Sequence, residues 1–187
     1  PKYDKHFVSE ILLTIYSRQV RMDTLGTNLP SQFVDRKFTV MGLNYSFMRV
    51  PNYRYRYGAS LDLLYDESSG AWGRRVINPA DGQSYDRIKR GKVGERVSLG
   101  LSARGEVVLP AYTMFANVGW QMIHGNHRDK RLYQIIGLKI YMKDKFFGTF
   151  GIRANNFSKA QFMFWSFGYT RDHTPIERRL KRSVSRR

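Results

Sequence analysis

The sequence has no cysteine, which excludes both a disulfide framework and a thiolate metal site. Histidine is scarce as well, and its four occurrences do not have the spacing of metal ligands on one element. They are His6, His124, His127 and His173. We therefore expect neither a metal nor another cofactor. The chain also lacks a run of about 18 apolar residues, so it predicts no transmembrane helix.

Acidic residues are in short supply, because 15 Asp and Glu stand against 32 Lys and Arg and leave a formal net charge of +17. Such a chain calls for an anionic partner, either nucleic acid or an anionic lipid or phosphorylated glycolipid. Apart from a cluster at the C-terminus, the basic residues are spread along the chain, which disfavours nucleic acid. With 42% hydrophobic and 14% aromatic residues, the chain is rich enough in apolar side chains to fold.

What the sequence does have is a period of two. In residues 53–66, Tyr57, Leu61 and Leu63 alternate with polar positions that include Arg56 and Asp62. This alternation is typical of a strand with one apolar and one polar face. Eight such strands are predicted, at residues 7–21, 36–49, 53–66, 95–108, 111–123, 132–143, 146–155 and 160–170.

The connections between these segments alternate between tight turns and longer loops, except for the short last connection. A single-chain outer-membrane barrel has this pattern, with short periplasmic turns and longer outer loops. We therefore predict an all-β, eight-stranded antiparallel transmembrane barrel over residues 1–170, with its apolar face toward lipid. The alternative is a soluble sandwich or a lipocalin-like barrel, in which the faces would be reversed.

The polar face of such a barrel points into a narrow interior that side chains can fill. We predict that the inward charged and polar residues pair there as a network. Its expected members are Arg56, Asp62, Ser102, Arg104, Glu106, Lys139 and Arg153. Aromatic residues near the strand ends fit the girdles that flank the apolar band of a membrane barrel.

Several stretches resemble the acyloxyacyl hydrolase-like barrels of Bacteroidota, relatives of the outer-membrane lipid A 3-O-deacylase. They are "YGASLDLLYDESS" (57–69), "VSLGLSARGEVVLPAYTMFANVGW" (97–120), "LYQIIGLKIYMKDKFFGTFGIRANN" (132–156) and "FWSFGY" (164–169). The resemblance covers roughly residues 36–169. It implies an integral outer-membrane barrel whose active members cut an ester-linked acyl chain from lipid A.

The resemblance also implies a catalytic histidine, a serine two residues after it, and a glutamate. No His-x-Ser occurs in this sequence. In some relatives, a histidine and a glutamate occupy the positions of Asn155 and Phe164. We therefore expect no catalytic residues and interpret the chain as a non-catalytic subunit or scaffold of an outer-membrane protein assembly. The alternative is a lipid A or phospholipid esterase with a rearranged site, built around Ser102 and an unidentified base.

Basic residues gather in two of the predicted outer loops. The candidates for binding lipid phosphate are Arg74, Arg75, His127, Arg128, Lys130 and Arg131. Arginine and lysine suit phosphate, so these loops predict contact with lipopolysaccharide. The alternative is that both loops are simply solvated.

Residues 171–187 continue beyond the last strand as a basic periplasmic tail. Thr174, Pro175 and Glu177 have the pattern of a helix start. Ile176, Leu180 and Val184 then recur every four residues and predict a short helix that docks on a partner protein. The alternative is a frayed tail. The chain begins at Pro1 without a recognisable signal peptide, which is compatible with an export signal that has been cleaved off.

Overall fold

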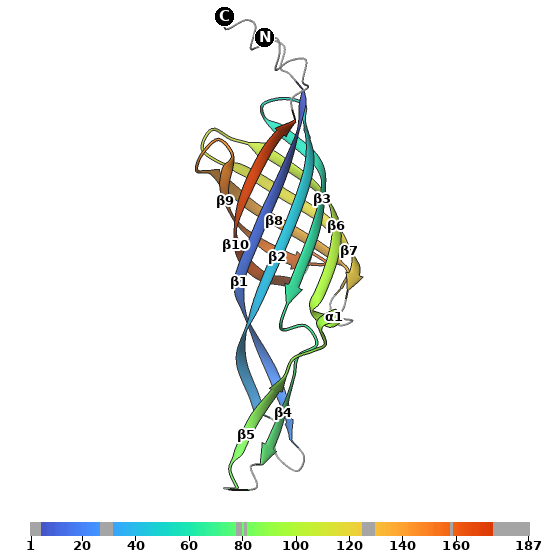
Figure 1. Cartoon of the computed structure of the whole chain (residues 1–187), viewed down its shortest axis with the longest axis vertical. Coiled ribbons are helices and arrows are strands. Elements are labelled where there is room, and N and C mark those ends of the chain that lie inside the picture. Colours follow the sequence, from blue (N-terminus) through green and yellow to red (C-terminus); the bar gives the residue numbers. More distant parts are fainter. Residues whose placement is uncertain are drawn as a thin grey trace, which may run out of the picture.

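A computed structural model describes residues 5–26, 32–77, 80, 82–124, 130–157 and 159–173. The chain forms a barrel with a narrower extension at one end (Figure 1). The barrel strands are β1 (His6–Gly26), β2 (Gln32–Val50), β3 (Tyr55–Asp66), β6 (Val97–Val108), β7 (Thr113–His124), β8 (Leu132–Tyr141), β9 (Phe146–Asn155) and β10 (Lys159–His173). The remaining elements are β4 (Trp72–Ile77), β5 (Ser84–Lys89) and the short helix α1 (Val93–Arg96).

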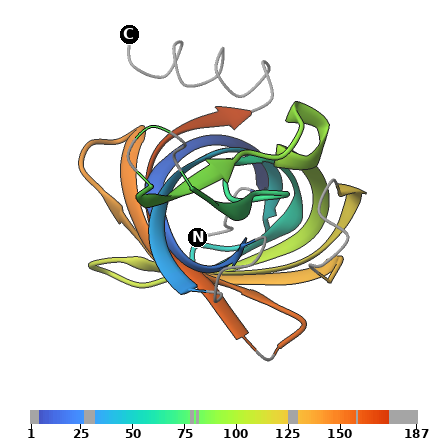
Figure 2. The same ribbon diagram turned by 90° about the horizontal axis from the view of Figure 1, so that it is seen from below.

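The eight barrel strands pair antiparallel with their neighbours all the way round. Closure comes from β10 pairing with β1, in a register that runs from Phe7 opposite His173 to Thr14 opposite Ser166. Seen from the end of the extension, the strands form a ring (Figure 2). The predicted eight-stranded barrel is thus confirmed. Within the described residues, no helix is long and apolar enough to cross a membrane.

The barrel carries its apolar side chains on the outside. Leu61 and Leu63 are 42% and 44% exposed, whereas Asp62 between them is 7% exposed. On β10, Trp165 and Phe167 are the most outward, at 67% and 70% exposed. A soluble barrel requires the opposite arrangement, so the lipocalin-like alternative is wrong.

Aromatic rings fill part of the interior by lying over glycines of neighbouring strands. Tyr133 is fully buried, and a Cβ added at Gly100 would lie 2.7 Å from its hydroxyl. A Cβ at Gly119 would run into the same ring. Glycine is therefore required at these two positions, because any larger residue would displace Tyr133.

The two ends of the barrel differ. Short turns join β2 to β3, β6 to β7 and β8 to β9 at one end, where the first and last described strands also begin and finish. We call this the turn end. The connections at the opposite end, the loop end, include the whole segment between β3 and β6.

At the loop end, β1 and β2 pair with each other well beyond the barrel wall, to Thr24 opposite Gln32. β4 adds to this hairpin by pairing parallel with β1 from Thr24 to Gly26, and β5 pairs antiparallel with β4. We call the parts of β1 and β2 beyond Ser17 and Thr39, together with β4 and β5, the stalk (Figure 1). The sequence predicted only a loop at 67–94, so this hairpin is a difference from expectation. Its pairing with β1 joins residues distant in the chain, which local alternation does not reveal.

Candidate functional site

The interior of the barrel holds a cluster of buried charges, and Lys139 of β8 lies at its centre. Its Nζ is 2.7 Å from Oε1 of Glu10 on β1 and 2.7 Å from Oε1 of Glu106 on β6. Lys139 and Glu10 are both fully buried. The inward alternation of three separate strands therefore brings these groups to one level of the barrel.

Two arginines complete this cluster. Nη2 of Arg104 lies 2.7 Å from Glu106 and 3.5 Å from Glu10. Nη1 of Arg56 lies 3.6 Å from Glu10 and 3.7 Å from Glu106, and donates to the Tyr141 hydroxyl at 2.7 Å. Buried charges need this degree of pairing because an isolated charge in a low-dielectric interior is very costly. We call Glu10, Arg56, Arg104, Glu106 and Lys139 the charge cluster.

Glu10 was not among the residues proposed for the interior network. The signal was present in the sequence, since Glu10 occupies an inward position of the first alternating segment. Its partner Lys139 is 129 positions away, however. Only closure of the barrel makes them neighbours.

Asp62 forms a second polar centre, which Asn44 connects to the charge cluster because its Oδ1 accepts a hydrogen bond from Nη1 of Arg104 at 3.5 Å. The Asp62 carboxylate accepts hydrogen bonds from Asn44 at 2.6 Å, Ser102 at 2.9 Å and the Tyr133 hydroxyl at 2.5 Å. Ser102 is 3% exposed. Its hydroxyl is committed to Asp62 inside a packed wall, an arrangement that holds the carboxylate and gives an ester no access.

Arg153 of β9 has a different environment from the other buried arginines. It is 4% exposed, and its guanidinium lies 4.3 Å from the centroid of the Tyr133 ring. Among the described residues, no carboxylate forms an ion pair with it, and its Nε has no hydrogen-bond partner. Arg153, Tyr16 and Asn117 line an interior cavity of about 50 Å³. Its lining also includes apolar side chains such as Leu12, Phe115 and Ile135, so Arg153 lies at a cavity of mixed polar and apolar character.

Asn155 and Phe164 are the residues for which the resemblance implies a histidine and a glutamate in some relatives. Asn155 ends β9, and an amide does not act as a base at neutral pH. Phe164 is 6% exposed and points into the barrel, where its ring lies against Gly151. Phe164 therefore has a packing role.

One serine does lie within hydrogen-bond distance of a histidine. Oγ of Ser9 is 2.8 Å from Nε2 of His173, across the seam between β1 and β10. No sequence pattern indicates this contact, because the two residues are 164 positions apart. Ser9 is only 8% exposed, and no ion pair connects His173 to a described carboxylate. The pair thus lacks the third group that orients the base in a serine esterase.

The residues proposed for phosphate binding do not come together as one site. Arg74 and Arg75 lie on β4 in the stalk, on opposite faces of the hairpin, and Arg75 donates to Ser84 at 3.1 Å. Lys130 and Arg131 immediately precede β8 at the rim of the barrel. His127 and Arg128 lie outside the described residues, as do Ile176, Leu180 and Val184 of the predicted tail helix.

No group of three His, Cys, Asp or Glu side chains in the described part of the chain is arranged to hold a metal ion. Many described polar groups of the interior are bonded to one another, whereas others, such as Oδ1 of Asn117 and Nε of Arg153, have no hydrogen-bond partner among the described residues. The barrel interior is thus largely polar, with a charge cluster at its centre.

Comparison with known proteins gives one match. The family model for the C-terminal domain of acyloxyacyl hydrolase matches residues 10–173, which is almost the whole barrel. No curated protein and no solved structure matches the chain. Since the family match extends from the inward Glu10 of β1 to the last residue of β10, the chain belongs to the acyloxyacyl hydrolase family.

Proposed function

We propose that this protein is an integral outer-membrane barrel without esterase activity that serves as a subunit or scaffold of an outer-membrane protein assembly. The observation that carries the proposal is the absence of a His-x-Ser sequence. It is supported by Asn155 at the end of β9 and Phe164 packed inside the barrel, where the resemblance implies a histidine and a glutamate. The family relationship supplies the barrel, and function depends on the residues placed on it.

The outer-membrane location rests on the surface of the barrel. Outward positions along β3 and β10 are apolar over the length of the wall. A membrane barrel must present such an apolar band to the hydrocarbon of the bilayer. The turn end then faces the periplasm and the loop end, with the stalk, faces outward. In this orientation lipopolysaccharide surrounds the outer half of the barrel and is its lipid partner.

Two measurements test the proposal. The tagged protein is purified from native membranes in several mild detergents, and we expect other envelope proteins to be recovered with it in stoichiometric amounts. Lipid A from cells with and without the gene is compared by mass spectrometry, and we expect identical acyl patterns. Recovery of this chain alone in every detergent would contradict the scaffold role, and a changed acyl pattern would contradict the absence of activity.

A lipid esterase with a rearranged site is the second candidate, and one observation favours it, the contact between Ser9 and His173 at 2.8 Å. The pair lies at the turn end, beside the inner leaflet in the proposed orientation. Ser102 is less suited, because it is buried and donates to Asp62. A fluorophosphonate probe decides the matter: labelling that Ser9→Ala abolishes and Ser102→Ala preserves would support an esterase at Ser9.

A further inference from the structure

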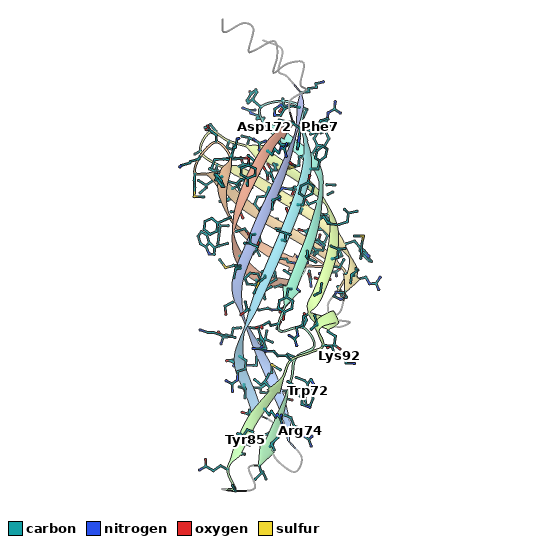
Figure 3. All side chains as sticks on the ribbon, viewed as in Figure 1. Phe7, Trp72, Arg74, Tyr85, Lys92 and Asp172 are labelled. Carbon is teal, nitrogen blue, oxygen red and sulfur yellow. The ribbon has the colours of Figure 1, made fainter. Side chains whose placement is uncertain are left out.

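The stalk carries a surface that neither the barrel nor the family relationship explains. On the outward face of the β4–β5 hairpin, Trp72 lies opposite Lys89 and Arg74 lies opposite Arg87. Tyr85 follows on the same face, opposite Val76. We call Trp72, Arg74, Tyr85, Arg87 and Lys89 the cationic face. Figure 3 shows Trp72, Arg74 and Tyr85 on this hairpin, clear of the barrel.

The charges on this face are arranged unfavourably for an isolated hairpin. Like charges directly opposite each other on paired strands destabilise the pairing, and Arg74 and Arg87 are such a pair. Lys89 adds a third cation two residues from Arg87, with its Nζ 5.3 Å from the Trp72 ring centroid. The described carboxylate of the hairpin, Asp86, lies opposite Arg75 on the other face. The cationic face thus gathers three basic side chains on two paired strands.

The face also offers shape and aromatic surface. A groove of about 500 Å³ follows the hairpin. Its lining includes Trp72, Arg74, Arg87 and Lys89 of this face, Val76, and Arg75 and Ile77 of the other face. Volumes of this order are typical of ligand sites. Trp72 and Tyr85 are 47% and 50% exposed, one toward each end of the face. Exposed aromatic rings can pack against the apolar faces of sugar rings, while arginines bind phosphate or carboxylate in a bidentate manner.

The height of the cationic face above the membrane decides between lipid and sugar. On the outside of the β1–β2 hairpin, the last apolar pair is Ile15 with Met41, and the next pairs on that face are Ser17 with Thr39 and Gln19 with Lys37. The hydrocarbon boundary therefore lies near Ile15. At about 3.3 Å per residue, β1 carries Thr24 roughly 30 Å further, or roughly 20 Å along the membrane normal at a tilt of about 45°.

Gly73 of β4 pairs with Thr24, so the cationic face begins at that height. The headgroup region of a leaflet is only about 5–7 Å thick, so lipid phosphates lie well below it. We propose that the cationic face binds an anionic saccharide of the cell surface, a sugar chain bearing phosphate or carboxylate groups. The inference rests on the proposed function for the outward orientation of the stalk.

The test uses the full-length protein in detergent micelles, titrated with hexagalacturonate as the anionic saccharide and with maltohexaose as the neutral one. We expect hexagalacturonate to bind at least about tenfold more tightly than maltohexaose, as loss of charge-assisted hydrogen bonds predicts. Arg74→Gln combined with Arg87→Gln should weaken binding by about tenfold or more, and Trp72→Ala should weaken it as well.

The matched control is Arg36→Gln with Lys37→Gln, which removes two exposed cations from β2 of the same stalk. This control should leave the affinity within about twofold, because screened surface charges contribute little. Gel mobility of unboiled samples reports that each variant keeps its barrel.

Four results would overturn the proposal: no saccharide binding, equal loss in the control variant, full competition by inorganic phosphate at the saccharide's own concentration, or binding only to phosphatidylglycerol vesicles. Capture of an acidic protein without any saccharide binding would likewise overturn it. Because a soluble sugar is titrated into purified protein, the result does not depend on esterase activity or on partner proteins. Failure here is therefore distinguishable from failure of the proposed function.

Discussion

At the scale of residues, the charge cluster is the part of the interior where a single substitution has the largest consequence. Lys139 contacts both Glu10 and Glu106, while Arg104 and Arg56 approach the same two carboxylates from other strands. Three cations thus share two anions in a space that excludes bulk water. Removal of one carboxylate would leave three cations facing a single anion, an excess of charge that neither solvent nor neighbours compensate.

Replacement of Glu10 by glutamine should therefore lower the free energy of unfolding by about 3–5 kcal/mol. Urea unfolding in detergent micelles measures this loss. Asp144→Asn is the matched control, because Asp144 is exposed in the turn between β8 and β9. Adding Lys139→Met to the Glu10→Gln variant should restore part of the stability, since it removes one uncompensated cation. A loss no larger than that of the control would contradict the role given to the cluster.

At the scale of elements, each barrel strand separates two environments over a single residue. On β6, Leu101 is 51% exposed on the outer face and Ser102 is 3% exposed within the barrel. In the proposed membrane location the outer residue faces lipid, and the inner one donates a hydrogen bond to Asp62. We therefore expect a substitution of Leu101 to affect insertion into the membrane, and a substitution of Ser102 to affect the stability of the barrel interior.

Leu101→Arg places a charge in the hydrocarbon and should cost about 2–4 kcal/mol near the midplane. Ser102→Ala removes one of three hydrogen bonds to Asp62 and should cost about 0.5–1.5 kcal/mol. The folded fraction after refolding into lipid vesicles compares the two variants directly. Equal tolerance of both substitutions would contradict the assignment of Leu101 to the lipid-facing side of β6 and of Ser102 to the barrel interior.

At the scale of the whole molecule, the barrel and the stalk are distinct parts of the described structure, and residues 174–187 follow β10 in the sequence. The barrel needs neither of the other two to complete its hydrogen bonds, because β10 closes directly on β1. We therefore expect that changes in the stalk or in the residues after β10 leave the barrel folded.

Truncation before Thr174 should leave the barrel folded and inserted but weaken its association with neighbouring envelope proteins. The predicted apolar stripe of Ile176, Leu180 and Val184 would otherwise be buried against a partner, as a short helix needs. Gel mobility reports insertion, and quantitative mass spectrometry of co-purified proteins reports association. Failure to insert, or partners retained at full abundance, would contradict the docking role of this segment.

The strand count, the inward and outward faces and the family relationship could all be predicted from the sequence. They follow from the period-two alternation of apolar and polar residues, as between Leu61 and Asp62. The missing esterase residues were also visible, since His-x-Ser is a local pattern. These features are local in the chain, so they can be recognised in the sequence without the tertiary structure.

Three features required the tertiary structure: the contact of Glu10 with Lys139, the contact of Ser9 with His173, and the addition of β4 and β5 to β1. Each joins residues that are far apart in the chain, and barrel closure or parallel strand pairing sets their register. Alternation says which face a side chain occupies, but not which distant side chain lies opposite. The physical reason is that the pairing partners of a strand depend on the whole set of strands. The buried ion pairs and the cationic face therefore follow from the tertiary structure and not from the local sequence.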